Sequence, residues 1–300
     1  MFPRINANLD ADTGSRDQPT MHFYRYHAIG NDYIVIRDAD AGGPMTPALA
    51  RRICHRNYGV GSDGILLHLS DASGKFALRI YNPDGSQSEK SGNGLRIFAR
   101  YLWDRKLVGG APFTVVTPAG EVTCKVMDNG RTVAVDMGTL TFDSARIPVA
   151  GPPREVLRER FTIGGNELEY SCASIGNPHC VLLREALSEA ETRALGPLIE
   201  TEPRFPNRTN VQFMQVLDRR NIAIQIWERG AGFTLASGSS ASAAAGVAHR
   251  LGLCDGDITV HMPGGAIRIE IDPRFAVRMT GPVTHIADGD IDAESLEGLA

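Results

Sequence analysis

The chain has 300 residues, 42% of them hydrophobic, and a formal net charge of −4. It can bury a substantial core in one to three domains, and its charge argues against a nucleic-acid-binding face. No apolar run is long enough to span a bilayer, the start does not resemble a signal peptide, and the five dispersed cysteines form neither a CxxC pair nor a metal-spaced cluster with histidine. We therefore expect a cytoplasmic protein with reduced thiols and no nucleic-acid or membrane partner.

The first block of the chain reads as strands around one helix. Residues 1–20 are polar and aperiodic, which predicts a disordered extension before a fold that begins at Met21. Apolar patterning predicts a buried helix over 94–106. Strands are predicted over 22–29, 33–38, 64–70, 75–82, 112–118, 121–127 and 132–138, with the turn-forming trio Gly30-Asn31-Asp32 between the first two.

A second block of similar plan begins near residue 140. A helical segment is predicted over 185–200, and the small residues over 239–251 predict a closely packed helix. Strands are predicted over 168–176, 180–185, 211–218, 222–230, 258–264, 266–271 and 276–291. Both blocks have strands, a Ser-Gly turn, one buried helix and more strands, so internal duplication is a reasonable hypothesis. We expect an α+β fold with two similar lobes that face each other across a cleft.

The two Ser-Gly turns are the first candidates for a functional site. Ser91-Gly92-Asn93-Gly94 opens directly into one predicted helix, and Ser237-Gly238-Ser239 opens into the other. A helix N-terminus has unpaired N–H groups and the positive end of the helix dipole, so it favours an anionic group. Two such helix starts facing one cleft predict a site for a small, negatively charged molecule.

Six motifs occur in an order that resembles the diaminopimelate epimerase family of cofactor-independent amino-acid epimerases and racemases. They are GNDYIVI (30–36), GVGSDGILL (59–67), NPDGSQSEKSGNGLR (82–96), GNPHCV (176–181), TNVQF (209–213) and ERGAGFTLASGS (228–239). The resemblance runs from Met21 to the GPVTHI segment (281–286). It implies two pseudosymmetric lobes, each a curved, mainly antiparallel half-barrel around a central helix. These lobes would span 21–137 and 138–282, with 283–300 returning to the first.

The resemblance also implies a proton-transfer mechanism between two opposed side chains. In the family, one cysteine thiolate removes the α-proton and a cysteine thiol on the opposite face delivers another. Ser91 and Ser237 occupy these two positions here. Because a hydroxyl is much harder to ionise than a thiol, each serine needs an adjacent base. His179 and Glu228 match family residues near the two cysteines, so a Ser91–His179 pair and a Ser237–Glu228 pair are expected.

The resemblance further implies how a substrate would be held. The backbone N–H groups of both helix starts would bind the carboxylate next to the reacting carbon. Arg229 matches the arginine that pairs with the distal carboxylate, and Phe233 stands where the family has a glutamate. The expected substrate-binding residues are Asn31, Asn82, Gly92, Asn93, Asn177, Asn210, Arg229, Gly238 and Ser239.

Three functions remain open at this point. The first is epimerisation or racemisation of a small amino or carboxylic acid. The second is a double-bond shift or an elimination that one competent base could support. The third is ligand binding without catalysis. The glycine-rich segments lack a P-loop lysine, so nucleotide binding is disfavoured, and we expect neither a cofactor nor a metal. A homodimer is compatible with all three functions.

Overall fold

The computed structural model of the protein describes residues 20–69 and 75–298, so nearly all of the predicted extension over 1–20 lies outside the described residues. The helices are α1 (Pro47–Cys54), α2 (Gly92–Asp104), α3 (Glu189–Glu200) and α4 (Gly238–Arg250). The strands of the first half are β1 (Met21–Ala28), β2 (Asn31–Arg37), β3 (Ile65–Leu69), β4 (Phe76–Tyr81), β5 (Gln87–Ser88), β6 (Phe113–Thr117), β7 (Gly120–Met127) and β8 (Thr132–Thr139). Those of the second half are β9 (Glu159–Ile163), β10 (Asn166–Ser174), β11 (Pro178–Leu183), β12 (Asn210–Asp218), β13 (Asn221–Glu228), β14 (Gly232–Thr234), β15 (Asp257–Met262), β16 (Gly265–Ile271), β17 (Ala276–Pro282) and β18 (Thr284–Ile291).

The strand pairing of β1 to β8 is repeated by β10 to β17. In the first half, β2 pairs with β3 and β4 with β6 in parallel, and the other pairs are antiparallel. In the second half, β11 pairs with β12 and β13 with β15 in parallel, again among antiparallel neighbours. Helices α1 and α3 fill equivalent connections, as do α2 and α4. The shared plan expected from the sequence is therefore present, and the fold is the predicted, mainly antiparallel α+β type.

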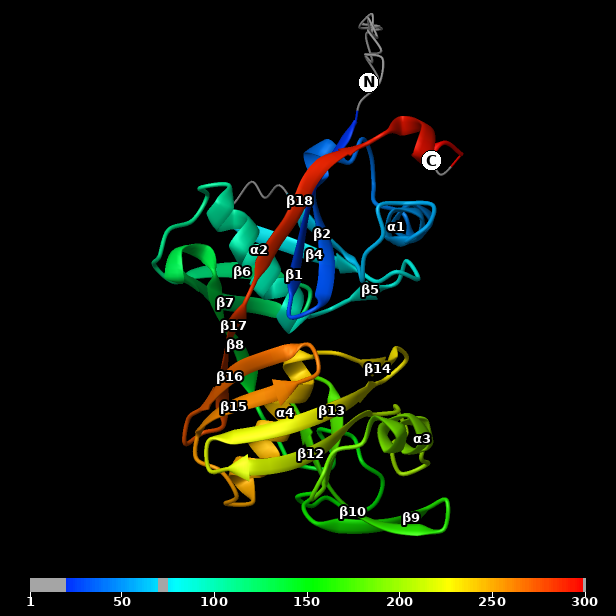
Figure 1. The fold of residues 1–300 in the computed structure, drawn as a ribbon, viewed down its shortest axis with the longest axis vertical. Coiled ribbons are helices and arrows are strands. Elements are labelled where there is room, and N and C mark those ends of the chain that lie inside the picture. Colours follow the sequence, from blue (N-terminus) through cyan, green and yellow to red (C-terminus); the bar gives the residue numbers. More distant parts are fainter. Residues whose placement is uncertain (1–19, 70–74, 299–300) are drawn as a thin grey trace, which may run out of the picture.

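Two strands connect the halves. Antiparallel pairing of β8 with β17 continues the sheet from one lobe into the other, and β18 returns to pair with β1. Figure 1 shows β1 to β7 and β18 in the upper lobe, β9 to β16 in the lower lobe, and β8 and β17 between them. The chain therefore leaves the first lobe on β8 and comes back to it through β17 and β18.

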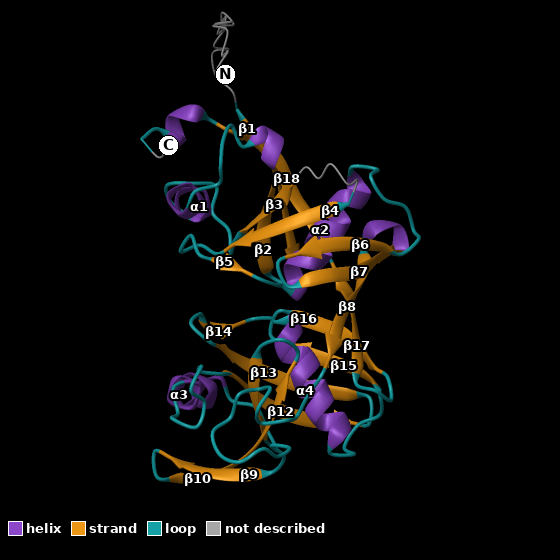
Figure 2. Cartoon of the chain, turned by 180° about the vertical axis from the view of Figure 1, so that it is seen from behind, coloured by secondary structure: helices purple, strands orange, loops and turns teal. Residues whose placement is uncertain are grey.

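Each lobe encloses one helix and carries another on its outside (Figure 2). Helix α2 packs against β1, β2, β7 and β8, whereas α4 packs against β10 to β13 and β15 to β17. The small residues of α4 permit this close approach, since a Cβ added at Gly246 would lie 2.4 Å from Leu140 Cδ1. On the outer faces, Ile53 of α1 and Ile199 of α3 belong to separate apolar clusters with the strands that these helices cover.

Most predicted elements are confirmed, with two kinds of difference. Helix α2 begins at Gly92, two residues before the predicted start, because Ser91 already caps it. Helix α1, the short strands β5 and β14, and strand β9 have no counterpart in the sequence-based prediction. All five cysteines are free and buried, as expected. Among the described residues, no helix is long and apolar enough to cross a membrane.

Candidate active site

The starts of α2 and α4 meet between the lobes. A Cβ added at Gly238 would lie 3.5 Å from Gly92 Cα, so the two helix starts are in near contact. Both glycines rest on the buried Met279 of β17: added Cβ atoms would lie 2.9 Å from Met279 Cε at Gly92 and 2.7 Å from Met279 Sδ at Gly238. Glycine at both positions therefore allows the close approach that places two positive helix ends at one point.

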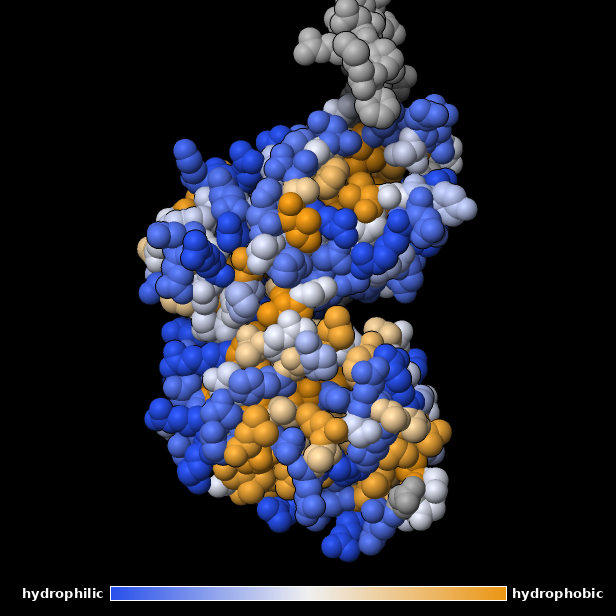
Figure 3. Space-filling view, in the orientation of Figure 1, coloured by the Kyte–Doolittle hydropathy of each residue, from blue (hydrophilic) through white to orange (hydrophobic). Residues whose placement is uncertain are grey.

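The surface is notched between the two lobes on the right-hand side of the view in Figure 3. Ser91 caps α2, and its Oγ accepts the Gly94 N–H at 3.0 Å. Ser237 caps α4 in the same way, and its Oγ accepts the Ser240 N–H at 3.4 Å. The N–H groups of the first residues after each cap have no intrahelical partner by helix geometry. The paired helix starts are thus suited to hold an anion.

Ser91 has a second polar neighbour, the phenol of Tyr33 on β2. The distance from Tyr33 Oη to Ser91 Oγ is 3.3 Å. Burial raises the pKa of Tyr33 to about 12. The hydrogen bond to Ser91 lowers this pKa and the charge of Glu228 raises it, and both effects are smaller than that of burial. The phenol is therefore protonated at neutral pH and can act as a hydrogen-bond donor.

The Ser237 hydroxyl lies near Glu228, the last residue of β13. Burial raises the pKa of the Glu228 carboxyl, the Ser237 hydroxyl lowers it by hydrogen bonding, and the charge of Asp63 raises it further. A carboxylate with a raised pKa is a stronger base than an exposed one, and Ser237 can pass its proton to it. The two residues are those of the expected Ser237–Glu228 pair, and their joint role stays a prediction.

His179 on β11 lies in a closed environment. Its side chain is fully buried, and Nε2 is 3.0 Å from Asn177 Oδ1, while Gln212 is the other polar neighbour of the ring. Burial lowers the pKa of His179 to about 3, so the imidazole is neutral at physiological pH. No hydrogen bond joins it to Ser91 among the described residues, where the sequence predicts a pair.

A polar network supports the start of α2. Asn93 Nδ2 donates to Asn31 Oδ1 at 3.0 Å, and Asn31 Nδ2 donates to Asp63 Oδ2 at 2.9 Å. Asn93 also reaches across the lobes, where its Nδ2 lies 3.4 Å from the carbonyl oxygen of Ala236. The fully buried Arg96 donates from Nη2 to Asn93 Oδ1 at 2.5 Å, whereas its Nε and Nη1 have no partner among the described residues. A buried cation this close adds positive potential to the α2 start.

A second network surrounds the β13–β14 turn. Asn210 Oδ1 accepts the Arg229 backbone N–H at 3.0 Å, and Arg229 Nη1 donates to the carbonyl oxygen of Asn207 at 2.9 Å. The buried Glu200 accepts from Trp227 Nε1 at 2.7 Å and from the Gly230 N–H at 2.8 Å. These contacts fix the turn that carries Arg229.

The remaining sequence-predicted residues lie in three places. Asn177 Nδ2 is 3.4 Å from Ser239 Oγ, so Asn177 belongs to the α4 start. Asn82 Nδ2 donates to Ser86 Oγ at 2.9 Å in the turn between β4 and β5. Phe233 of β14 lies under the guanidinium of Arg193 of α3, with Cζ 4.2 Å from the ring centroid.

Four residues of these networks were not predicted from the sequence. From the sequence, Tyr33, Arg96, Glu200 and Gln212 read only as members of strands, helices or motifs, with no separate functional role. The sequence contains a pattern that marks Tyr33 as a candidate site residue. Tyr33 stands three residues after Gly30 in a Gly-Asn turn, and His179 stands three residues after Gly176 in a second Gly-Asn pair. The partners of Glu200, by contrast, are far apart in sequence and give no local pattern.

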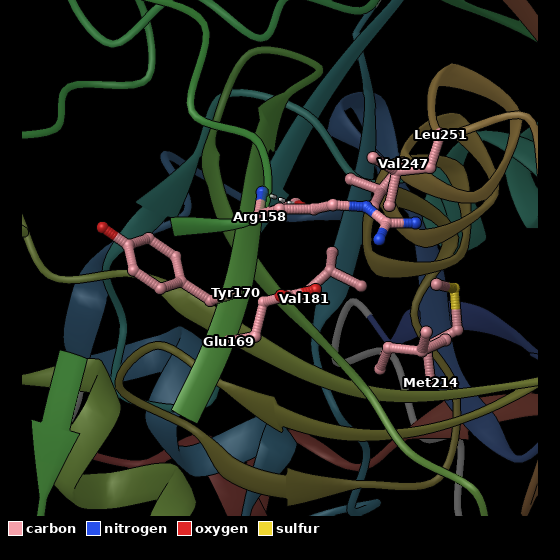
Figure 4. A pocket seen from close by; sticks show the side chains of 9 residues that line it. Arg158, Glu169, Tyr170, Val181, Met214, Val247 and Leu251 are labelled. Atoms are coloured by element: carbon pink, nitrogen blue, oxygen red, sulfur yellow. Dashed lines mark hydrogen bonds between the residues drawn. The ribbon is translucent and has the colours of Figure 1, made fainter. Parts of the chain in front are cut away.

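A small hollow elsewhere in the second lobe does not include the helix starts. Figure 4 shows Arg158 extending toward Val247 of α4 and toward Leu251, the residue after this helix, with Glu169, Val181 and Met214 on neighbouring strands. Val247 lies about 15 Å along α4 from Ser237 at the usual rise per residue. This hollow is therefore separate from the candidate active site.

Solved structures with the same architecture are racemases, epimerases and related proteins. A hydroxyproline epimerase from Agrobacterium vitis aligns with a TM-score of 0.69 at 15% identity, covering 94% of each chain. A predicted epimerase from Pseudomonas aeruginosa aligns with a TM-score of 0.64 at 20% identity, covering 90% of this chain and 99% of that one. The chain therefore shares the two-lobed fold of these solved structures.

The sequence comparisons identify the family. The diaminopimelate epimerase family matches residues 23–142 and 171–286. Diaminopimelate epimerase 2 of Nostoc sp. is 55% identical over 275 residues, covering 91% of this chain and 96% of that protein. Diaminopimelate epimerase of Moorella thermoacetica is 41% identical over 275 residues, covering 90% and 99%. The chain belongs to the diaminopimelate epimerase family.

Family membership confirms the predicted enzyme class. The protein is an isomerase of the epimerase type, which acts by proton transfer at the carbon next to a carboxylate of a small acid. The alternatives of a double-bond shift, an elimination or ligand binding alone are not favoured by these relatives.

Proposed function

We propose that the site between the helix starts epimerises diaminopimelate, the compound that gives the relatives their name, with serine in place of cysteine on both faces. The near contact of Gly92 with Gly238 carries this proposal, because it brings Ser91 and Ser237 to one place from opposite lobes.

Binding would use both helix ends and the turn at Arg229. The N–H groups of Gly92, Asn93, Gly238 and Ser239 would hold the carboxylate beside the reacting carbon, and would also stabilise negative charge as the proton leaves. The guanidinium of Arg229 suits the distal carboxylate, because arginine binds carboxylates in a planar, bidentate manner. Asn31, Asn82, Asn177 and Asn210 would complete the polar lining.

Proton removal would use the Ser237–Glu228 pair. Ser237 Oγ takes the α-proton while its own proton passes to the Glu228 carboxylate, so that the substrate becomes a carbanion and Glu228 becomes neutral. Ser91 Oγ then delivers a proton to the opposite face of the α-carbon, which inverts the configuration. Two groups acting on opposite faces suffice for inversion without movement of the substrate.

His179 would act through its neighbours. A neutral, buried imidazole that bonds Asn177 is suited to orient that amide toward Ser239. Its lowered pKa makes it a weak base, so we assign proton transfer to Glu228 and positioning to His179.

The experiment is incubation with LL- and meso-diaminopimelate in deuterated water, followed by chiral separation and mass measurement. We expect each stereoisomer to convert to the other, with one deuterium at the inverted carbon. Glu228→Gln should abolish both inversion and exchange, whereas Glu167→Gln, an exposed glutamate on β10, should change neither. Absence of conversion and exchange with the unmodified protein would overturn the proposed substrate.

Three further expectations from the sequence are retained here as proposals. The lobe boundaries are 21–137 with 283–300, and 138–282; the protein is cytoplasmic; and it forms a homodimer. Light scattering of the purified chain tests the last of these directly.

A further inference from the structure

The hydroxyl of Ser91 has two hydrogen-bond partners. Its oxygen accepts the Gly94 N–H at 3.0 Å and lies 3.3 Å from Tyr33 Oη, and either hydroxyl can be the donor in the second contact. When the phenol donates, the Ser91 oxygen accepts two hydrogen bonds and its own proton is free for another acceptor. The same two donors would stabilise the oxygen if it lost that proton, because hydrogen bonding to a charged form favours it.

Tyr33 is held firmly in this position. It is 7% exposed, on a strand that pairs with both β1 and β3. A Cβ added at Gly64 would lie 2.7 Å from Tyr33 Cε1, so the ring is packed directly on the Gly64 backbone. The Gly64 carbonyl is itself fixed by the Ile34 N–H at 3.1 Å and by Ser62 Oγ at 2.9 Å. The ring cannot move away from Ser91 without disturbing this segment.

Tyr33 also has the right protonation state to give a proton. The phenol remains neutral at physiological pH because burial and the charges of Glu228 and Asp63 oppose its ionisation. The two faces of the site therefore differ: a carboxylate with a raised pKa stands behind Ser237, and a neutral phenol stands behind Ser91.

We propose that Tyr33 is a positioning residue that acts through Ser91. It supplies a proton when Ser91 protonates the carbanion, and the reverse conversion retraces the same steps, with the Tyr33 phenolate accepting a proton through Ser91 and the protonated Glu228 supplying one through Ser237. This inference rests on the proposed epimerase function. Ser91 Oγ gives its proton to the substrate carbanion, forming the new C–H bond, and takes the Tyr33 Oη proton in the same step. The phenolate regains a proton from water, and Glu228 releases the one that it accepted. Protons and charge balance over the cycle, and no oxidant or reductant is needed.

The test separates inversion from exchange with retention. In Tyr33→Phe, the Ser237–Glu228 pair still removes the α-proton of the epimer whose hydrogen faces it, and returns deuterium to the same face. We expect inversion to fall about 100-fold, while deuterium exchange with retention continues for that epimer. Equal loss of both, or inversion at the rate of the unmodified protein, would overturn the inference.

Two controls keep this result interpretable. Tyr24→Phe removes a phenol hydroxyl from a residue of β1 that packs against Tyr101, and we expect it to change neither rate. Site-specific replacement of Tyr33 by 3-fluorotyrosine preserves the fold while lowering the phenol pKa. It should move the alkaline limb of the pH profile of inversion to lower pH. An unchanged alkaline limb contradicts the relay, that is, the passage of a proton from Tyr33 through Ser91. If the unmodified protein neither inverts nor exchanges diaminopimelate, the proposed function fails, whereas normal inversion in Tyr33→Phe refutes only the relay.

Discussion

Gly64 offers a way to move Tyr33 without altering its chemistry. In Gly64→Ala, the added Cβ would lie 2.7 Å from Tyr33 Cε1 and 2.7 Å from the Tyr81 carbonyl oxygen. Neither contact is the end of a flexible side chain, so the strand or the ring must shift. Ordinary contact needs about 3.5–4.0 Å, which means a displacement of about 1 Å.

This displacement sets the size of two effects. Overpacking a buried site destabilises by about 1–3 kcal/mol, and replacing glycine by alanine returns about 0.4–1 kcal/mol through the unfolded chain, which leaves a net loss of about 0–2.6 kcal/mol. Because no flexible side chain can relieve either contact, we expect the upper part of this range, about 1–2.6 kcal/mol. The hydrogen bond from Tyr33 to Ser91 is already long at 3.3 Å and would be broken by such a shift. Inversion should therefore fall by about the same factor as in Tyr33→Phe, roughly 100-fold.

Urea unfolding and the inversion rate measure these effects separately. In the double variant Gly64→Ala/Tyr33→Phe, the two losses of inversion should not multiply, because both remove the same interaction. Gly43→Ala is the matched control, since an added Cβ there meets no atom within 4 Å. A stability loss below about 0.5 kcal/mol, or rate losses that multiply, would refute the reasoning.

Three other outcomes are expected. Glu228 must be ionised to accept a proton, and its pKa is raised, so the acid limb of kcat/KM should lie above pH 4.5, the ordinary pKa of glutamate. An acid limb below pH 4.5 would contradict this role. A raised pKa in the folded state also means that ionised Glu228 destabilises the fold. Glu228→Gln should therefore increase the free energy of unfolding at pH 7, and this gain should disappear near pH 4, where the glutamate is protonated. Urea unfolding at both pH values measures the difference. Gly246→Ala should destabilise by about 1–3 kcal/mol through its contact with Leu140, and Leu140→Ala in the same chain should relieve this overpacking; simple addition of the two losses would argue against the contact.

The sequence predicted the repeated plan of strands and the two buried helices, because alternating and helical periodicities are local signals. It did not predict α1, although Thr46 and Pro47 form a helix-start signature in which Thr46 Oγ1 accepts the Leu49 N–H at 3.1 Å. That helix has only eight residues, so its apolar positions span little more than two turns and give a short periodic pattern.

Site residues in local sequence motifs were predicted, whereas a contact between distant segments was not. Ser91, Ser237 and Glu228 lie in motifs whose neighbours are close in the chain or known from the family, and the structure brings Ser237 and Glu228 together. The contact of Tyr33 with Ser91 joins residues 58 positions apart and depends on how β2 packs beside α2. Periodicity marks Tyr33 only as a strand residue, and nothing in the sequence gives the direction of its hydroxyl.

The duplicated strand plan has a chemical consequence. Gly30 and Gly176, with φ of 88° and 109°, introduce β2 and β11, so Tyr33 and His179 hold matching places in the two halves. Asn82 directly follows β4 in one half, and Glu228 is the last residue of β13 in the other. The two halves of a nearly symmetric backbone therefore carry different side chains at two matching positions. Exchanging the members of each pair would move the phenol to the second lobe and the carboxylate to the first, while the backbone stays the same.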